Sequence, residues 1–376
     1  MCRSADGLGA NLPDPHAPVT LIRLMCRPRW QPQSATPGAY YRLVGMPGLP
    51  PDHQSFARAV LPAYGRDPDS TLQLLSLSEN ATYLVADEEP MVLRVHRPGY
   101  HSLAAIRSEL SWMAALRADT EVTTPQLIHA VDGRDVVAAE AGGNVLHVDA
   151  VTFIEGCTAE ENPDAVGFDE LGRLSAYMHD HVELWSGPDY FTRFRWDVDA
   201  TLGPHARWGN WREAPGLTSD GRAVIERAAA EVAARLTEFG QGPDRFGLIH
   251  ADLRMANLMI DPSSGCSAIT VIDFDDCGWS WHLADLGAVV SFIEDTAEAE
   301  QMINDWLRGY REVREILVDH LGMIATFVML RRLTLTAWVA SHADADSAVA
   351  FTDGFSVGTV ELAERYLSDR GWMRYE

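Results

Sequence analysis

Residues 249–260 read Ile249-His250-Ala251-Asp252-Leu253-Arg254-Met255-Ala256-Asn257-Leu258-Met259-Ile260, and residues 271–276 read Val271-Ile272-Asp273-Phe274-Asp275-Asp276. Two short apolar strands are predicted here, with Asp252, Asn257 and Asp273 at their ends. Phosphoryl transfer requires such a set, because a carboxylate must lie near the attacking hydroxyl and oxygen ligands must hold Mg²⁺. The stretch therefore favours phosphoryl-transfer chemistry over the alternative of an Asx-rich turn between two strands.

Around this stretch the chain changes from a β-rich part to a helical part. Strands are predicted at 72–77, 81–85, 91–95, 126–129, 136–140 and 146–153, with one helix from residue 52 and another at 101–117. After residue 154 helices are predicted at 168–184, 219–239, 283–293, 297–314, 317–341 and 347–367. We expect an α+β fold with a small β-rich N-lobe (51–153), a larger, mainly helical C-lobe (154–376) and a cleft between them, preceded by a Pro-rich N-terminal extension (1–50).

The two motifs in this order resemble those of the aminoglycoside phosphotransferase and choline kinase family, small-molecule relatives of the protein kinases. The family patterns H-x-D-x-x-x-x-N and I-D-F/W/Y match residues 250–257 and 272–274. The resemblance implies a bilobal protein-kinase-like fold, with Asp252 as the catalytic base and Asn257 and Asp273 as Mg²⁺ ligands. It also implies that Asp285, in a segment similar to the family's D-P-x-x-D-L, braces the catalytic loop. Motif order extends the resemblance over about residues 52–340.

A kinase-like fold also needs a cation on its third strand to hold the nucleotide phosphates, oriented by an acid on the next helix. The chain contains no Lys, so the candidate cation is Arg94, and Glu109 is its expected partner. The family resemblance places Ser78 and Asn80 in the loop that would contact phosphate, although this loop has no glycine. It also places Phe153 and Ile154 at the hinge that would receive adenine. ATP or GTP and Mg²⁺ are therefore the expected cofactors.

Composition excludes several classes of protein. All 30 basic residues are Arg, so there is no Walker A lysine, no Schiff-base lysine and no Ser-Lys dyad. The net charge of −24 argues against binding to nucleic acid or to an anionic membrane. Five Cys without a CxxC spacing fit reduced thiols, and we expect a soluble, cytoplasmic protein. The pattern His179-Asp180-His181 predicts exposed polar residues, because alternate positions on a helix point apart and cannot share a metal.

The acidic residues favour a small cationic, hydroxyl-bearing substrate. Candidate substrate ligands are Asp275, Asp276, Glu160, Glu161, Glu294 and Asp295, of which the first two follow the metal-binding motif directly. Family precedent favours inactivation of an antibiotic, either an aminoglycoside or a basic cyclic peptide of the tuberactinomycin type. Amine alcohols and hydroxy-amino acids remain open. The segment 191–211, with Trp196, Trp208 and Trp211, forms either a wall over the acceptor site or a packed connector.

Two other functions remain open from the sequence. The first is a bacterial stress-response type Ser/Thr protein kinase, which the stretch 92–102 and the Trp-rich segment also resemble. The second is a pseudokinase-like regulatory protein, indicated by Arg94 in place of lysine and by the loop without glycine. The sequence is compatible with a monomer or a homodimer.

Overall fold

The structure is a computed structural model that describes residues 48–78, 80–261, 268–341, 354–373 and 375. All of them belong to one compact unit, Thr36–Glu376. The predicted N-terminal extension lies outside the described residues up to position 47. Its proposed end at residue 50 is too late, because Leu49 is buried in the core of the β-rich part.

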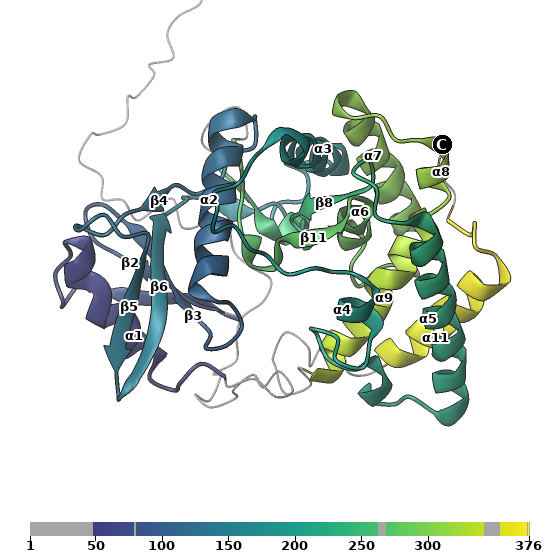
Figure 1. The fold of residues 1–376 in the computed structure, drawn as a ribbon, viewed down its shortest axis with the longest axis horizontal. Helices are drawn as coiled ribbons and strands as arrows, with labels where there is room; N and C mark the ends of the chain where they lie inside the picture. Colours follow the sequence, from purple (N-terminus) through teal and green to yellow (C-terminus); the bar gives the residue numbers. More distant parts are fainter. Residues whose placement is uncertain (1–47, 79, 262–267, 342–353, 374, 376) are drawn as a thin grey trace, which may run out of the picture. The chain divides into compact units, whose positions relative to one another are not determined.

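An antiparallel sheet forms the first part of the fold (Figure 1). Its strands are β1 (Leu72–Leu77), β2 (Asn80–Val85), β3 (Met91–His96), β4 (Leu127–Ile128), β5 (Val136–Ala141) and β6 (Asn144–Thr152). The order is β1-β2-β3-β6-β4, and β5 also pairs with β6. Helix α1 (His53–Val60) packs on this sheet with Phe56, Ala57 and Val60 buried, followed by the 3₁₀ turn η2 (Leu61–Tyr64). Strands and helix thus bury one common apolar face.

Helix α2 (Leu103–Asp119) connects β3 to β4 and lies between the sheet and the helical part in Figure 1. It begins where the Ser102 hydroxyl accepts a hydrogen bond from the Ala105 N–H. Its buried side chains, among them Ile106 and Trp112, belong to the core that continues into the helices beyond residue 154. Glu109 is fully buried in the middle of α2. The helix therefore fixes this carboxylate against both parts of the fold.

The chain leaves the sheet after Thr152 and passes close to a second small sheet. Gly156 has φ +138°, and a Cβ there would lie 2.0 Å from the carbonyl oxygen of Ile260. Only glycine fits this close approach of two backbones. Strand β7 (Cys157–Thr158) then pairs with β9 (Leu258–Ile260), which pairs with β10 (Ile269–Val271). The catalytic motif is thereby tied to the segment that connects the two parts.

Helices make up most of the remaining fold (Figure 1). They are α3 (Phe168–Leu184), α4 (Val198–Leu202), α5 (Ser219–Phe239), α6 (Leu283–Val289), α7 (Glu298–Val313), α8 (Val318–Leu321), α9 (Ile324–Ser341) and α11 (Phe355–Ser368), with 3₁₀ turns η3 (Trp211–Glu213), η4 (Met255–Asn257) and η5 (Phe274–Asp276). Helix α3 packs on α7, α6 on α9, and α5 on α11. A hairpin of β8 (Phe246–Ile249) and β11 (Gly278–Trp281) completes the architecture. The predicted α+β, protein-kinase-like layout is confirmed. The lobe boundary at 153/154 stays a prediction.

Two predicted helices differ from those in the structure, and a third begins outside the described residues. The helix predicted over 317–341 is two helices, α8 and α9, separated at Gly322 and Met323. The helix predicted over 283–293 ends at Val289. The start of the one predicted over 347–367 lies outside the described residues, where α11 begins at Phe355. By length and composition α9 could cross a membrane, but its apolar window is 83% buried inside the protein, as in the core helix of a globular fold.

Candidate active site

The catalytic loop begins where β8 ends, and one buried carboxylate holds its backbone. Asp285, near the start of α6, accepts hydrogen bonds from the N–H of Ala251 (2.7 Å) and of His250 (3.3 Å). Ala251 has φ +69°, a left-handed conformation that costs energy for any residue other than glycine. Asp285 thus stabilises the strained turn that precedes Asp252, in agreement with the bracing role that the family resemblance implies.

The prediction of exposed polar side chains at His179 and His181 is wrong. Both are buried, and His179 lies on the second layer behind the catalytic loop. Its Nε2 donates to Asp285 Oδ2 (3.1 Å), and its Nδ1 accepts from the Tyr310 hydroxyl (2.9 Å). Burial lowers the pKa of His179 well below its ordinary value, so the ring is neutral. Its position in sequence gave no indication of the partner Asp285, 106 residues away.

The carboxylate of Asp252 is held by three side chains. Arg331, on α9, donates to its Oδ1 (2.5 Å), Arg254 approaches from within the loop (3.3 Å), and Asn257 Nδ2 donates to Oδ2 (3.1 Å). Burial favours the neutral acid, but the charges of Arg254 and Arg331 outweigh it and lower the pKa of Asp252. An ionised carboxylate in a fixed orientation can accept the proton of an attacking hydroxyl.

His250 connects the catalytic loop to the neighbouring segment at Ile272. Its Nε2 donates to the carbonyl of Ile272 (3.1 Å), while its Nδ1 accepts from the N–H of Asp252 (3.3 Å). Burial lowers the pKa of His250, so this single neutral tautomer joins the two catalytic segments. These contacts give His250 a structural role in the catalytic loop.

Asn257 and Asp273 offer the oxygens that a divalent metal would use. The amide nitrogen of Asn257 donates to the backbone oxygen of Asp252 (2.8 Å), which directs the side-chain oxygen elsewhere. Asp273, at φ +64°, is solvent-accessible in the cleft but surrounded by protein. This loss of water and the neighbouring charges of Asp275 and Asp252 raise the pKa of Asp273 to about 8. Such crowding of negative charge favours binding of a cation.

The donor set fits a metal held jointly with nucleotide phosphates. Within the described residues, no group of three or more His, Cys, Asp or Glu side chains forms a complete metal site. Mg²⁺ in phosphotransferases typically takes one or two protein oxygens and completes its shell with water and phosphate oxygens. Asn257 and Asp273 match that requirement, and their role as ligands stays a prediction.

Arg94, on β3, lies at the centre of a buried charge cluster. Its guanidinium donates Nη1 to Glu109 (2.5 Å) and both Nε and Nη2 to Asp149 (2.9 and 3.0 Å). His96 donates to the same Asp149 (2.5 Å). Burial alone would lower the pKa of Arg94, but Asp149 and Glu109 outweigh it and raise that pKa well above its ordinary value. Two of the five N–H groups of Arg94 remain for phosphate.

The residues that were predicted to contact the phosphates and the adenine differ from one another in burial and in hydrogen bonding. Asn80 is buried, and its Nδ2 donates to Oδ1 of Asp275 (3.1 Å), so its side chain joins β2 to the metal-motif segment instead of facing a phosphate. Ser78, whose N–H donates to the Asn80 carbonyl (3.0 Å), is exposed. Phe153 and Ile154 follow β6 directly and are half-buried. Phosphate and adenine contacts at Ser78, Phe153 and Ile154 stay predictions.

Asp275 is not available as a substrate ligand. It is buried, and His101 donates to its backbone carbonyl (2.9 Å) and lies 3.4 Å from Oδ1. Burial is outweighed by the charge of His101, and the pKa of Asp275 lies well below its ordinary range. Asp276 is half-exposed and accepts a hydrogen bond from the Tyr100 hydroxyl (2.8 Å). Of the two acids, Asp276 can still reach a ligand.

Glu294 is likewise wrongly predicted as a substrate ligand. It is fully buried, and its Oε2 accepts a hydrogen bond from Arg332 Nη1 (2.9 Å), so the carboxylate pairs with a buried arginine and does not face solvent. Asp295 is exposed and lies 3.7 Å from the same arginine nitrogen. Glu161 is exposed and accepts from the N–H of Thr158 (2.9 Å). Glu160, also exposed, contributes to the charge around Arg254. Roles for Asp295, Glu160 and Glu161 stay predictions.

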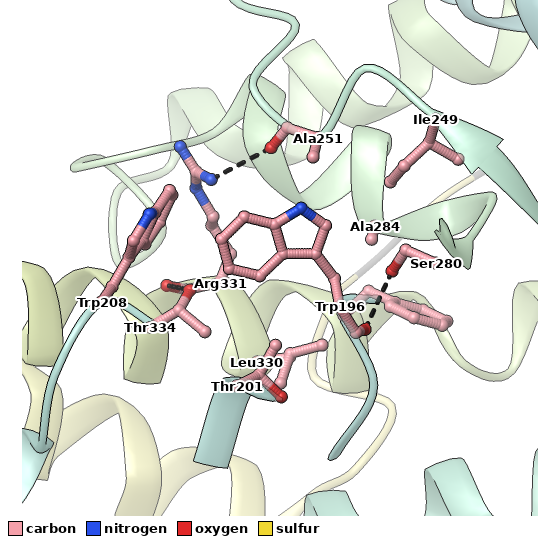
Figure 2. Close-up of a pocket in the computed structure, with 11 residues that line it drawn as sticks. Trp196, Thr201, Trp208, Ile249, Ala251, Ser280, Ala284, Leu330, Arg331 and Thr334 are labelled. Carbon is pink, nitrogen blue, oxygen red and sulfur yellow. Dashed lines mark hydrogen bonds between the residues drawn. The ribbon is translucent and has the colours of Figure 1, made fainter. Parts of the chain in front are cut away.

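A small cavity lies beside the catalytic loop (Figure 2). It has a volume of about 40 Å³, and its wall includes Trp196, Trp208, Ala251 and Arg331. In Figure 2 the indole of Trp196 projects toward the centre, and the Arg331 guanidinium extends past Trp208 to the carbonyl of Ala251. Trp196 and Trp208 thus line the cavity, whereas Trp211 is buried in the main core. Trp211 fits the packed connector, and a wall over the acceptor site stays a prediction for Trp196 and Trp208.

Local sequence patterns did not reveal Asp149, Arg331 or Arg193. Asp149 had a detectable signal, since a lone carboxylate within the apolar strand β6 requires a buried cation. Arg193 is buried and donates to the carbonyls of Cys277 (2.6 Å), Ala105 (3.2 Å) and Asp275 (2.5 Å), linking α2 to the metal motif. No local pattern identifies Arg193 or Arg331, because their partners lie about 80 residues away in sequence.

Comparison with known proteins identifies the family to which this chain belongs. The profile of the phosphotransferase enzyme family, which includes the aminoglycoside phosphotransferases, matches residues 71–316. The chain belongs to this family. It is similar to the solved structure of a microcompartment-associated aminopropanol kinase, at 43% identity and a TM-score of 0.78, over 85% of this chain and 98% of that one. It is also similar to amicoumacin kinase of Bacillus subtilis (strain 168), at 24% identity over 72% of this chain and 80% of that protein.

A more distant structure shows the fold alone. A choline/ethanolamine kinase family protein from Mesorhizobium loti has 16% identity and a TM-score of 0.55, over 85% of this chain and 96% of that one. A solved amicoumacin kinase complex holds AMP-PNP and Ca²⁺. The chain is therefore a small-molecule kinase that transfers phosphate to a hydroxyl group. The regulatory, non-catalytic alternative is set aside.

Proposed function

We propose that the protein is an ATP- and Mg²⁺-dependent kinase of small amino alcohols, of the kind represented by aminopropanol. The observation that carries this proposal is the narrow cavity of about 40 Å³ next to the loop that carries Asp252. A space of this size holds about three water-sized groups, which suits part of a small acceptor.

Different side chains have different roles in the proposed phosphoryl transfer. The acceptor oxygen forms a bond to the γ-phosphorus of ATP, the bond from that phosphorus to the β,γ-bridging oxygen breaks, and ADP leaves. Asp252 accepts the hydroxyl proton, since Arg254 and Arg331 keep its carboxylate ionised. Asn257 and Asp273 would hold Mg²⁺, which would compensate the charge of the phosphates when bound. Arg94, fixed by Asp149 and Glu109, directs its remaining N–H groups to the phosphates.

The acceptor class rests on size, charge and similarity together. Residues 155–376 hold 38 acidic and 18 basic side chains, a balance of −20 that attracts an ammonium group. Asp276, half-exposed beside the metal motif, is the candidate partner of that group. The relative with 43% identity is described as an aminopropanol kinase. These observations favour an amino alcohol over the antibiotic that family precedent suggests, and similarity to amicoumacin kinase keeps the antibiotic as the second candidate.

The test is a substrate panel read by mass spectrometry and by release of ADP. The panel contains 1-amino-2-propanol, ethanolamine, choline, threonine, spectinomycin, a tuberactinomycin and amicoumacin, each with Mg²⁺ and ATP or GTP. Asp252→Asn is the matched control, because it keeps the size of the side chain and removes the base. The proposal holds if an amino alcohol gains a phosphate with the wild type and not with the variant. Turnover of an antibiotic alone, or phosphorylation of the protein alone, would overturn it.

A further inference from the structure

Arg193 is buried in the Trp-rich segment, and its guanidinium donates to three backbone carbonyls just after the candidate metal ligand Asp273. Its Nε donates to the carbonyl of Cys277 (2.6 Å), and its Nη2 donates to those of Asp275 (2.5 Å) and Phe274 (3.4 Å). A 3₁₀ turn as short as η5 cannot pair its last carbonyls within itself, so the arginine provides hydrogen bonds that the turn lacks. The path of the chain after Asp273 is therefore fixed by Arg193.

Other contacts hold the segment around Arg193 against the same part of the chain. The indole N–H of Trp196 donates to the carbonyl of Asp276 (2.8 Å), which lies between the carbonyls that Arg193 binds. The N–H of Trp279 donates to the Phe194 carbonyl (2.9 Å), and the N–H of Trp196 donates to the Trp279 carbonyl (2.8 Å). Arg193 is thus mounted on backbone that is itself paired with the chain that follows the metal motif.

Arg193 also contacts the charge cluster around Arg94. Glu109 lies between the two arginines, since its Oε1 accepts from Arg94 Nη1 (2.5 Å) and its Oε2 lies 3.6 Å from Arg193 Nη1. The same Nη1 donates to the carbonyl of Ala105 (3.2 Å), one turn before Glu109 on α2. The side chains of Glu109 and Arg193 have no exposed surface, so solvent screens their attraction little. One carboxylate therefore joins the arginine expected to bind phosphate to the arginine that holds the metal motif.

We propose that Arg193, with Trp196 beside it, is a positioning residue for the metal site. It keeps Asp273 in place through the turn η5, and it keeps this turn in register with Arg94 through Glu109. The inference rests on the proposed function for its metal and nucleotide, and adds to that function a residue outside both motifs. Loss of a group that orients a metal ligand typically weakens metal binding by about 10- to 100-fold. The role requires arginine, because a single ammonium nitrogen cannot reproduce the separate directions of Nε and the two Nη groups.

The experiment measures the Kd of Mn²⁺, used in place of Mg²⁺, for the protein with AMP-PNP, by electron paramagnetic resonance of the free ion. No acceptor is present, so the result does not depend on which alcohol is phosphorylated. Arg193→Lys keeps a positive charge beside Glu109 and loses the fork, and we expect its Kd to rise by about 10- to 100-fold. The matched control is Arg195→Lys, two residues away at a side chain that is 48% exposed, which should keep the wild-type Kd.

A second variant and a stability measurement separate positioning from a general loss of structure. Trp196→Phe removes only the N–H that binds the Asp276 carbonyl, and its Kd should rise by about 2- to 10-fold. Thermal unfolding selects a temperature at which each variant is folded. Unfolding of part of the sample would lower the number of Mn²⁺ sites and leave Kd unchanged. If Arg193→Lys does not fold, Trp196→Phe decides alone.

The outcomes distinguish this inference from the proposed function. A raised Kd in folded Arg193→Lys, with the wild-type Kd in Arg195→Lys, supports the positioning role. The wild-type Kd in folded Arg193→Lys would overturn the inference and leave the proposed function standing. A wild-type protein that binds no Mn²⁺ in the presence of AMP-PNP would overturn both.

Discussion

Arg331 and Asp252 are 79 residues apart in sequence, and the guanidinium donates a 2.5 Å hydrogen bond to the catalytic carboxylate. The same guanidinium donates to the Ser291 hydroxyl (2.8 Å) and lies 5.1 Å from the centre of the Trp208 ring. Helix α9 therefore contacts both Asp252 and the cavity beside the catalytic loop through a single side chain.

Loss of this contact should affect turnover. In Arg331→Met, Asp252 keeps Arg254 and Asn257 but loses a charge-assisted hydrogen bond worth about 1.5–3 kcal/mol. We expect kcat to fall roughly 10- to 100-fold, with KM for ATP nearly unchanged because Arg331 lies on the acceptor side. Steady-state kinetics of this variant and of Arg308→Met, an exposed arginine on α7, provide the comparison. A variant with wild-type kcat would show that Arg331 has no role in positioning the base.

Asp285 should matter for stability as much as for activity. Its carboxylate accepts from the N–H groups of His250 and Ala251 and from His179 Nε2. In Asp285→Asn one oxygen is replaced by an NH₂ group, which faces a donor and leaves buried N–H groups unpaired. We expect the free energy of unfolding to fall by about 2–3 kcal/mol, together with a loss of activity. Urea unfolding measures the first effect, and an unchanged midpoint would contradict the role assigned to Asp285.

Local patterns in the sequence were sufficient for the elements and the two motifs. Helices α3 and α5 have the predicted ends, because apolar residues recur there with helical spacing and Thr218 caps the start of α5. Asp252, Asn257 and Asp273 were found because the chemistry requires those residue types at those spacings, at the ends of predicted strands. Helix ends and motif residues can be predicted in this way because both depend on residues that are close together in the sequence.

Contacts between segments that are far apart in the sequence could not be predicted from local patterns. Asp275 was predicted to bind the substrate because it follows the metal-binding motif directly, and Glu294 because an acid of the helical lobe would attract a cation. Their partners, His101 and Arg332, lie 174 and 38 residues away and become visible only when the elements pack. Arg94 was expected to pair with Glu109 alone, and the register of β3 against β6 adds Asp149. Burial and ion pairing depend on tertiary structure, so the substrate ligands were the weakest part of the prediction.

Gly156 should tolerate no side chain. Its φ of +138° and the 2.0 Å separation between the Cβ of an alanine there and the Ile260 oxygen both oppose substitution, and the clash is with backbone that cannot rotate away. We expect Gly156→Ala to lower the free energy of unfolding by roughly 3 kcal/mol or more. Gly133→Ala is the control, because Gly133 also has positive φ (+84°) but nothing lies within 4 Å of its Cβ position. Its cost should be about 1–2 kcal/mol. Equal losses in the two variants would contradict the close approach at Ile260.

Acid should destabilise the protein through its buried histidines. Burial lowers the pKa of His179 and His282 well below the ordinary 6.5, and their rings stack at 4.6 Å near the cationic Arg314. The unfolded chain binds these protons below pH 6.5 and the folded chain does not, so the stabilisation is complete above that pH and is lost as pH falls. Asp285 and Asp273 act in the opposite direction, because burial raises their pKa values to about 6 and about 8 and the folded state takes up those protons first. The contribution of the histidines is therefore measured as a difference between the wild type and a variant that lacks one of them.

The measurement is urea unfolding at pH 7.5, 6.5 and 5.5. Each of the two buried histidines should contribute a loss of up to about 1.4 kcal/mol at pH 5.5, since a group that stays neutral in the folded state loses that much one unit below its unfolded pKa. His282→Gln removes one of the two groups, so between pH 7.5 and 5.5 it should lose less stability than the wild type by up to about 1.4 kcal/mol. His129→Gln, at a side chain that is 60% exposed, should leave the dependence as in the wild type. If His282→Gln follows the wild-type dependence on pH, His282 is not held neutral in the folded protein.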